Sequence, residues 1–470
     1  MSRLISIILS CFSLSSATAL STAAILSTAT LTEPIITVTT QGFATLSTQT
    51  MLNHQPFFQA VGNGRHCGSC HQENQGWTVT PTALQARFRE SQGLDPIFRL
   101  VDGANSPHQR VNTLAQRQLA YSMLLNYGVI RIAKPMPLAA DFSLVKVDDP
   151  YGYANEKDLS VFRRPLPSTN VAFLSTVMWD GRETQHTKKY GNCPLDVQSR
   201  PCYASLTTSL LHQAHSAIQG HSEFHLGLNS MNLQRIVRFE MQHFSAQEYD
   251  GEAGKLSVNG AFGGVKALST LRTYFGMNDF FAGDYRTKAK FNPQVFTLYQ
   301  AWLPRSTSHT VNAKQAAIAR GEVLFNHRPI VITGVTGFND QRQQRRIVAT
   351  CSSCHSAPNI GNTTVPHFMN IGTADGELRH LDQPLYTFKH NQTGQIVRTT
   401  DAGLALLTGK WQDIGKFKVP ILRGLAARAP YFHHGQAANL QAVIDFYNRR
   451  FQIHFSAQEK ADLIAFLGAL

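Results

Sequence analysis

The sequence of 470 residues lacks a long hydrophobic run. A helix that spans a bilayer needs roughly 18 to 20 uninterrupted apolar residues, and no segment after the first residues approaches that length. The apolar stretch at residues 5–9 is far too short. The sequence therefore predicts no membrane span. Its hydrophobic content of 43% is that of a globular protein with apolar material for two or three domains.

Acidic residues are also few. The chain has 30 Asp and Glu against 43 Lys and Arg, which gives a net charge of +13. The basic residues are spread along the chain and are not gathered into a stripe with interleaved aromatic residues, which argues against a nucleic-acid partner. We expect a basic protein whose electric field attracts an acidic partner and weakens with salt.

Cysteine is scarce, with seven residues in the chain. The first residues, MSRLISIILSCFSLSSATALSTA, have one early arginine, an apolar stretch and then small residues, which predicts a signal peptide cleaved after about Ala19. A lipoprotein cleavage at Cys11 is the alternative, although the apolar run before it is short. Because exported proteins can hold disulfides, we pair Cys193 with Cys202; the alternative is two free thiols.

Four of the cysteines stand in two copies of one motif, RHCGSCHQ at residues 65–72 and ATCSSCHS at residues 349–356. Two thiols separated by two residues can form thioether bonds with the two vinyl groups of one haem, and the next residue can then place an imidazole nitrogen on the iron. The sequence therefore predicts two covalently bound haem c groups. Their thioether cysteines and proximal ligands would be Cys67, Cys70 and His71, and Cys351, Cys354 and His355.

Zinc binding and thiol redox chemistry fit these motifs less well than haem. A zinc site usually needs a second pair of Cys or His near by, and His66 and Cys202 do not supply a convincing set. A redox-active CxxC pair needs neither the following histidine nor a second copy.

The motifs divide the chain into two units. We expect a signal peptide at residues 1–19, an extended lead at 20–50, an N-terminal haem c domain with insertions at 51–309 and a C-terminal haem c domain at 310–470. Apolar residues at helical spacing open the second unit at residues 313–326, and Ser456 and Glu459 form a capping box ahead of a final helix. The predicted fold is mainly α, with two cytochrome c-like helical haem domains, long irregular connections and few strands.

One hexapeptide, HFSAQE, occurs at residues 243–248 and again at 454–459. Each copy follows a helical run that begins Leu-Gln, LQRIVRFEMQ and LQAVIDFYNRR. The repetition suggests an internal duplication.

Three longer segments resemble the bacterial di-haem cytochrome c peroxidases and their MauG-like relatives. Residues 415–447, GKFKVPILRGLAARAPYFHHGQAANLQAVIDFY, are similar to that family's K-V-P-T-L-R, A-P-Y-F-H-D-G and L-x-x-A-V motifs. MWDGRE at 178–183 resembles its F-W-D-G-R turn, and residues 166–182 keep its Pro, Thr and Asn before the Trp. This chain has extra residues before Asn170 and around 183–205.

The resemblance implies a division of labour between the two haems. Peroxide would react at the N-terminal haem, at His71 with an open distal side, and the C-terminal haem at His355 would pass electrons. Trp179 would lie between the haems, and Asn170 would hold a calcium ion.

The resemblance also suggests why the two irons differ. Tyr447 stands seven residues after Leu440, where peroxidases of this family have an axial methionine and MauG-like members have tyrosine. In the first unit Ala217 stands seven residues after Leu210 and cannot bind iron. Tyr447 would then fill the sixth coordination position of the second iron, whereas that position of the first iron would stay free. The alternative for Tyr447 is an ordinary core aromatic residue.

The same alignment, LHQAHSAIQGHSEF against the family's L-x-E-Q-A-x-G-P-I-x-N-P-x-E-M, places Gln213 at the distal glutamine and Glu223 at the distal acid. A carboxylate or imidazole there can move a proton between the oxygens of peroxide; Glu223 is the first choice and His221 the second. In a competing alignment LQRIVRFE is the counterpart of LQAVIDFY, which would bring Glu240 to the pocket and offer Met241 as a ligand. Arg423 and His433 would serve the second haem's propionates, with solvated surface roles as the alternative.

These inferences predict an exported, periplasmic di-haem peroxidase that reduces hydrogen peroxide to water. Its electrons would come from a small redox protein, a cytochrome c or a cupredoxin, and homodimers are common among such proteins. The first alternative is a MauG-like oxidase of a protein or organic substrate. The second is a di-haem electron carrier without catalytic activity.

Overall fold

The computed structural model describes residues 34–47, 55–185, 205–303 and 310–470. Residues 34–470 form one compact unit. The expected signal peptide and the Cys193–Cys202 pair lie outside the described residues. No helix in the described ranges has both the length and the apolar character to cross a bilayer.

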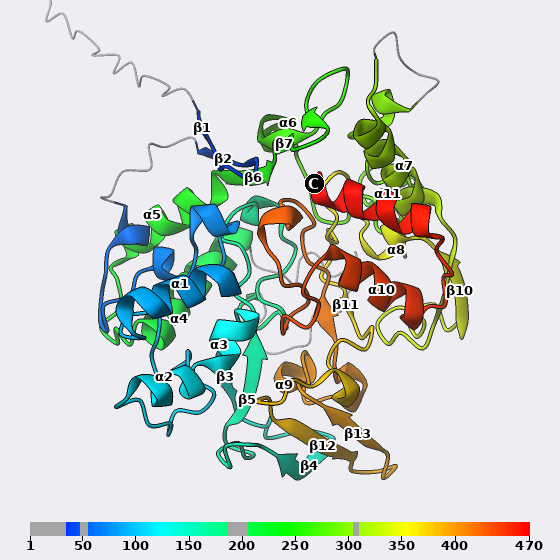
Figure 1. Ribbon diagram of the computed structural model, residues 1–470. Coiled ribbons are helices and arrows are strands. Elements are labelled where there is room, and N and C mark those ends of the chain that lie inside the picture. Colours follow the sequence, from blue (N-terminus) through cyan, green and yellow to red (C-terminus); the bar gives the residue numbers. More distant parts are fainter. Residues whose placement is uncertain (1–33, 48–54, 186–204, 304–309) are drawn as a thin grey trace, which may run out of the picture. The chain divides into compact units, whose positions relative to one another are not determined.

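Helices form most of the regular structure. The α-helices of the described residues are α1 (Pro81–Ser91), α2 (Leu114–Ala120), α3 (Ser122–Tyr127), α4 (Leu206–His221), α5 (Ser230–Met241), α6 (Gly264–Thr270), α7 (Ala313–His327), α8 (Cys351–Cys354), α9 (Ala405–Thr408), α10 (Leu440–Arg450) and α11 (Ala457–Gly468) (Figure 1). The expected capping box at Ser456 and Glu459 is confirmed: each side chain accepts a hydrogen bond from the other residue's backbone N–H at the start of α11.

Strands are more numerous than the sequence suggested, and a mainly helical fold is not confirmed. The part of the chain that the structure describes forms six small antiparallel sheets. They are β1 (Ile35–Val38) with β2 (Phe43–Ser47) and β6 (His243–Gln247); β3 (Ile130–Lys134) with β5 (Leu159–Arg163); β4 (Phe142–Asp148) with β12 (Leu385–His390) and β13 (Ile396–Thr399); β7 (Tyr249–Asp250) with β8 (Gly254–Lys255); β9 (Ile330–Thr333) with β10 (Arg346–Ala349); and β11 (Phe368–Met369) with β14 (Phe417–Lys418). Most strands have only two to five residues between turns, so their alternation is hard to detect in the sequence.

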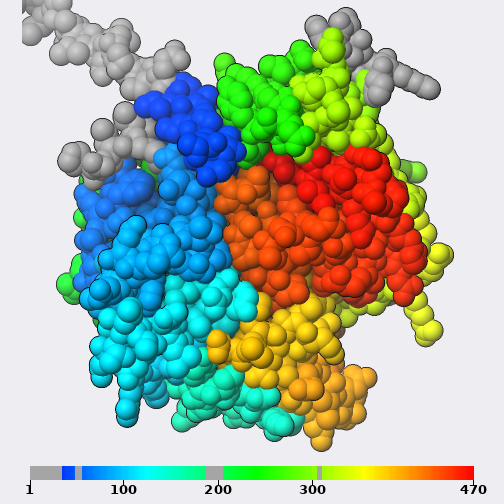
Figure 2. Space-filling model, viewed as in Figure 1, coloured from blue at the N-terminus to red at the C-terminus, as the bar shows by residue number. Residues whose placement is uncertain are grey.

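Strand pairing joins segments that are far apart in the sequence. β4 pairs with β12 from Phe142 against His390 to Asp148 against Leu385, and the two strands lie side by side in Figure 1. Figure 2 shows the surface of this region as adjoining cyan-green and yellow-orange segments. The pairing crosses the predicted domain boundary, and the division at residue 310 stays a prediction.

The largest apolar core lies under α7, α10 and α11. Helix α11 buries Leu463, Phe466 and Leu467, whereas Ile464 is only partly buried. Gly321 of α7 allows α11 to come close, because a Cβ at that position would lie 2.0 Å from the carbonyl oxygen of Asp462. This close approach fixes the helix pair that covers the second CxxCH.

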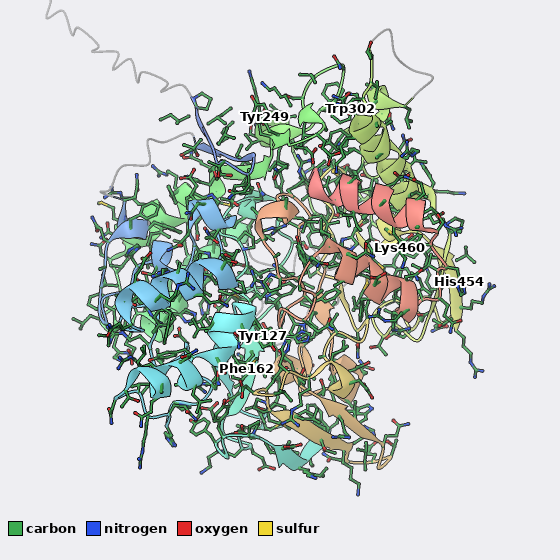
Figure 3. The ribbon with its side chains drawn as sticks, viewed as in Figure 1. Tyr127, Phe162, Tyr249, Trp302, His454 and Lys460 are labelled. Atoms are coloured by element: carbon green, nitrogen blue, oxygen red, sulfur yellow. The ribbon has the colours of Figure 1, made fainter. Side chains whose placement is uncertain are left out.

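A second core holds the first CxxCH. The ring of Phe239 on α5 lies 4.9 Å from that of Phe57 and 6.2 Å from that of Trp77, and all three side chains are buried. A smaller cluster packs Tyr127 of α3 against Phe162 of β5 (Figure 3).

The repeated hexapeptide adopts two structures. The first copy of HFSAQE forms β6, whereas the second ends the connection after α10 and begins α11 at Ala457. The repetition alone therefore does not support an internal duplication. The two halves instead correspond in their helix pairs, because α4 packs on α5 and α10 packs on α11.

Candidate functional site

Backbone groups near the first CxxCH shape the motif and orient its histidine. Cys67–Ser69 form a short 3-10 helix, η2, and the Ser69 hydroxyl accepts a hydrogen bond from the backbone N–H of His66 at 3.1 Å. The Nδ1 of His71 lies 3.0 Å from the carbonyl oxygen of Trp77. Since a carbonyl can only accept, Nδ1 carries the proton and Nε2 keeps its lone pair. This is how a ligating histidine is usually oriented.

The second CxxCH repeats this arrangement. Cys351–Cys354 form α8, and Nδ1 of His355 lies 2.5 Å from the carbonyl oxygen of Gly361. Burial lowers the pKa of His355 to about 4 and also lowers the pKa of His71. Both imidazoles are therefore neutral at pH 7, which is the form that binds iron.

The four thiols of the motifs are unpaired and partly buried. Burial raises the pKa of Cys70 to about 11 and the pKa values of Cys351 and Cys354 to about 12, and it raises that of Cys67 further. No group of three or more His, Cys, Asp or Glu in the described part of the chain could hold a metal ion. Protonated thiols next to a neutral imidazole fit thioether attachment of haem better than zinc binding.

Each motif opens into an apolar cavity. The first cavity has an empty volume of about 1540 Å³ and the second of about 1730 Å³, open solvent included. Helices α4 and α5 line the first cavity with Leu210, Gln213, Ala214, Ala217, Ile218, His221, Ile236 and Glu240. Helices α10 and α11 line the second with Leu440, Val443, Ile444, Tyr447, Leu463 and Leu467.

The two cavities share a wall, which contains Trp179. The indole Nε1 donates a hydrogen bond to the carbonyl oxygen of Arg164 at 2.9 Å. The other residues that line both cavities are Arg164, Pro165, Leu166, Pro167, Lys418, Pro420, Ile421 and Arg428. The structure thus places Trp179 between the cavities; its role in electron transfer stays a prediction.

The shared wall carries positive charge without a partner. Arg164 is buried and donates to the carbonyl oxygens of Val79 at 2.8 Å and Tyr127 at 3.0 Å, and Arg428 donates to that of Ile421 at 3.0 Å. Neither guanidinium has a carboxylate within ion-pair distance among the described residues. Burial lowers the pKa of Arg164 to about 9 and that of Arg428 to about 10.

Lys418 adds a third basic group to this wall. Its Nζ donates to the carbonyl oxygen of Thr176 at 3.0 Å, and burial lowers its pKa to about 7. Buried cations are costly unless an anion compensates them. A haem carries two propionate carboxylates, so the wall fits this cofactor. Sequence analysis missed Arg164, Lys418 and Arg428, because their common position arises only in the fold.

His221, at the end of α4, lines the first cavity and forms a hydrogen-bonded pair with Asp102. Its Nδ1 lies 2.7 Å from Oδ2 of Asp102, and Asp102 Oδ1 accepts from Arg65 Nη1 at 2.7 Å. Asp102 and Arg65 are buried, whereas 39% of the His221 side chain is exposed. Burial alone would raise the pKa of Asp102, but the hydrogen bond from His221 and the Arg65 charge outweigh it and hold that pKa below its usual value. The aspartate therefore stays ionised and fixes the histidine tautomer.

The other predicted distal residues are divided between the cavity and the surface. Gln213 and Ala217 line the first cavity. Glu223 is exposed, and it accepts a hydrogen bond from Asn63 Nδ2 at 2.8 Å. The structure does not bring Glu223 into the cavity wall, because α4 continues through His221 and the chain turns outward after it. Of the competing pair, Glu240 lines the cavity and Met241 does not.

Tyr447 lines the second cavity beside both cysteines of the motif. Burial raises its pKa well above the usual value, and the Cys354 and Cys351 thiols raise it further. Its ring lies 6.2 Å from Phe451. This position agrees with the Tyr447 oxygen as a ligand of an iron in the second cavity, and ligation stays a prediction.

The two residues expected at the second haem's propionates occupy different places. His433 lines the second cavity, is buried, and stacks on Phe417 at 3.9 Å, and its Nε2 has no hydrogen-bond partner in the described structure. Arg423 does not line this cavity. It donates instead to the carbonyl oxygens of Leu470 at 3.0 Å and Asn359 at 3.1 Å, so it holds the end of the chain against the core.

The side chain of Asn170, the predicted calcium ligand, is hydrogen-bonded to β6. Its side-chain amide accepts from the backbone N–H of Ser245 at 3.0 Å and donates to the Ser245 carbonyl oxygen at 2.8 Å. Both polar atoms of the amide are thus used in tying residue 170 to β6. Calcium takes six to eight oxygen ligands, which include carboxylates, amide and backbone carbonyls and waters. The described residues contain no group of three or more His, Cys, Asp or Glu that could hold a metal ion, and calcium at Asn170 stays a prediction.

No protein-family model matches the sequence. Cytochrome-c peroxidase IdrP1 of Pseudomonas sp. (strain SCT) is 34% identical over 179 residues, which are 34% of this chain and 41% of that protein. Cytochrome c551 peroxidase of Nitrosomonas europaea is 29% identical over 121 residues, 26% of this chain and 30% of that protein. Methylamine utilization protein MauG of Paracoccus denitrificans is 29% identical over 140 residues, 29% of this chain and 32% of that protein.

The matched segments thus span less than half the length of these curated relatives. Among solved structures, a MauG-like protein associated with microbial copper homeostasis covers 69% of this chain and 77% of its own, at 18% identity and a TM-score of 0.34. Over the segments matched by the curated relatives, the chain is similar to bacterial cytochrome c peroxidases and to MauG, and its two CxxCH motifs agree with that similarity.

Proposed function

We propose that the protein is a di-haem c peroxidase that reduces hydrogen peroxide to water in the first cavity. Two electrons and two protons would convert each peroxide into two waters, with the electrons arriving through the second cavity. The difference between the cavities is the observation that supports this proposal. The first has a histidine–aspartate pair and Ala217 in its wall, whereas the second has Tyr447.

The residues of both cavities fit haem c. Haem attached at the first motif would supply an iron that takes up peroxide and passes electrons to it. His71 and His355 would hold the two irons through Nε2. The basic groups of the shared wall would compensate the propionates, and the unpaired Nε2 of His433 would find a partner there.

His221 would move the proton that peroxide cleavage needs. Asp102 keeps Nδ1–H in place, so Nε2 can accept a proton from the near oxygen of peroxide and return it to the far oxygen. The half-exposed ring can then exchange protons with solvent. Gln213, on the same face of α4, would orient peroxide through its amide. We assign this proton transfer to His221 and not to Glu223, because Glu223 is exposed.

Electrons would reach the first cavity through the shared wall. Trp179 lines both cavities and its hydrogen bond to Arg164 holds the indole in one orientation. The donor would be a small redox protein, a cytochrome c or a cupredoxin, with an acidic surface suited to the net charge of +13. The signal-peptide pattern supports a periplasmic location.

A MauG-like oxidation of a protein or organic substrate is the second candidate, and Tyr447 is the observation that favours it. A tyrosine oxygen stabilises ferric iron more than a methionine sulfur does, and so lowers the reduction potential. A second haem that is hard to reduce would suit removal of electrons from a substrate better than delivery from a carrier.

The test uses the purified full-length protein. Mass analysis after denaturation should find two haems bound to the chain, and the ferric protein should give one high-spin and one low-spin paramagnetic signal. Reduced cytochrome c should be oxidised in the presence of peroxide. Two low-spin signals without peroxide turnover would instead identify an electron carrier. Peroxide consumption that oxidises an added protein but no reduced cytochrome would identify the oxidase.

A further inference from the structure

The second helix of each pair presents the same face to its cavity. In α5 the residues Ile236, Phe239 and Glu240 have the spacing that Leu463, Phe466 and Leu467 have in α11. Phe239 and Phe466 are the buried anchors of the two helices. Ile236 and Glu240 line the first cavity, and Leu463 and Leu467 line the second. Glu240 therefore stands where the second cavity has a leucine.

Glu240 is buried without compensation. The residue is 8% exposed, and its Oε2 has no hydrogen-bond partner in the described structure. Burial is the cause that raises its pKa to about 8. Burying an unpaired polar group costs free energy that a leucine would not. A carboxyl kept at such a cost in a cofactor cavity is a candidate for function.

The elements around α5 leave this carboxyl in an apolar environment. The short helices η1 (Pro56–Phe58) and η4 (Val171–Phe173), which pack on α5, carry only apolar side chains. From η2 the Cys67 thiol is close enough that Glu240 raises its pKa. The other titratable and charged groups that face the cavity are Arg65, His66, Cys70, His71, Asp102, Arg163, Arg164, Arg182, His221, Lys418 and Arg428.

We propose that Glu240 is an internal acid of the first cavity, which takes up a proton when an electron reaches the haem bound there and releases it when the electron leaves. One electron on the iron and one proton on the carboxylate leave the charge of the cavity unchanged. In an apolar environment such compensation is favourable, because uncompensated charge is expensive there. The inference rests on the proposed haem in the first cavity and does not need peroxide turnover.

The charge of the haem decides whether the reduction potential rises or falls with pH. Oxidised haem carries one more positive charge than reduced haem, so it lowers the pKa of Glu240 and favours the carboxylate. Reduction raises that pKa and draws a proton in. Between the two pKa values Glu240 must therefore make the reduction potential of the first haem fall as pH rises. The second haem has Leu467 at the matching position. Lys418 of the shared wall, whose pKa burial lowers to about 7, faces both cavities, whereas Glu240 faces the first alone.

The experiment is a spectroelectrochemical titration of both haems at several pH values in the holoprotein. The wild type should show a steeper fall of potential with pH at the first haem than at the second, and Glu240→Gln should reduce that difference. Glu240→Leu, which copies position 467, should reduce it as well. Glu90→Gln on the exposed end of α1 is the matched control and should retain it.

A second measurement keeps the proposal testable if the variants fold poorly. The redox-difference infrared spectrum of the wild type should contain a protonated-carboxyl band that gains intensity on reduction. An unchanged difference in pH dependence between the two haems in Glu240→Gln, or a wild-type spectrum without this band, overturns the proposal. Fewer than two haems per chain would instead refute the proposed function, and absence of peroxide turnover alone would leave the Glu240 test valid.

Discussion

The side chain of Trp179 donates from its indole Nε1 to the carbonyl oxygen of Arg164, 2.9 Å away, and the backbone N–H of Lys418 donates to the Trp179 carbonyl oxygen at 2.9 Å. The chain segment before the W-D-G-R turn and the K-V-P segment of the C-terminal half therefore meet at this tryptophan. Both haem cavities use the same few residues as their common wall.

Replacing Trp179 by Phe should slow electron transfer between the haems without changing haem content. The variant loses the bond to Arg164 and a ring that lines both cavities, and should lose roughly 1 kcal/mol of stability. Stopped-flow oxidation of the reduced second haem by peroxide measures the rate. Trp302→Phe is the control, because Trp302 donates a similar bond, to Val258 at 3.1 Å, away from the cavities (Figure 3). Equal rates in both variants would refute a role for Trp179.

His221→Gln should lower the rate of peroxide reduction by about 10²–10⁴-fold, the usual contribution of a positioned acid–base group. The steady-state oxidation of reduced cytochrome c measures it. His454→Gln is the control, since His454 is exposed after α10 (Figure 3). Glu223→Gln separates the two assignments: a loss of activity in that variant and not in His221→Gln would return the role to the carboxylate.

A buried ion network under the shared wall should matter for stability. Arg163 contacts Asp401 through Nε at 2.7 Å and Asp180 through Nη1 at 2.5 Å, and all three side chains are at most 1% exposed. Asp401→Asn leaves the guanidinium only partly compensated and should cost about 3–5 kcal/mol in the free energy of unfolding.

The matched control for this network is Asp148→Asn. Asp148 pairs with Arg379 at 2.8 Å but is 52% exposed, so its loss should cost at most about 1 kcal/mol. Denaturant unfolding followed by circular dichroism compares the two variants. Equal losses of unfolding free energy in Asp401→Asn and Asp148→Asn would mean that burial of the network adds no stability.

Glu240 should also make stability fall as pH rises. Its pKa is raised from the ordinary value of 4.5 to about 8 in the folded chain. Between these values the folded state holds a proton that the unfolded state has lost, so raising pH favours unfolding. The loss should be about 3 kcal/mol between pH 4.5 and 7, at 1.36 kcal/mol per pKa unit. Unfolding of Glu240→Gln measured over this range should lack this part of the slope, and an identical slope would show that the carboxyl ionises freely.

Local patterns predicted the parts of the site that depend on residues close in sequence. The two cysteines and the histidine of each CxxCH lie within five residues, and the carbonyl that orients each histidine comes only six residues later, at Trp77 and Gly361. The start of α11 likewise depends on Ser456 and Glu459, three residues apart. Such features could be predicted because few other arrangements of so short a segment exist.

Residues that meet across the chain could not be predicted in this way. His221 and Asp102 are 119 residues apart, and Arg164 and the carbonyl oxygen of Arg428 are 264 apart. Motif alignment placed Glu223 at the cavity, yet Glu223 lies two residues past the end of α4 and is exposed. Arg423 looked like a cofactor residue from its motif, but in the fold it supports Leu470.

The sequence by itself determined the chemistry that the chain can carry: two thiol pairs, each followed by a histidine, and the helix that closes the chain. Only the tertiary structure decided which groups face each cavity, which wall the cavities share, and that the same six residues, HFSAQE, form a strand in one place and lead into a helix in another. The physical reason is that the covalent chain itself keeps residues that are near in the sequence close together in space. Burial, by contrast, is set by packing against distant segments, and it is burial that gives Glu240 and Lys418 their shifted pKa values.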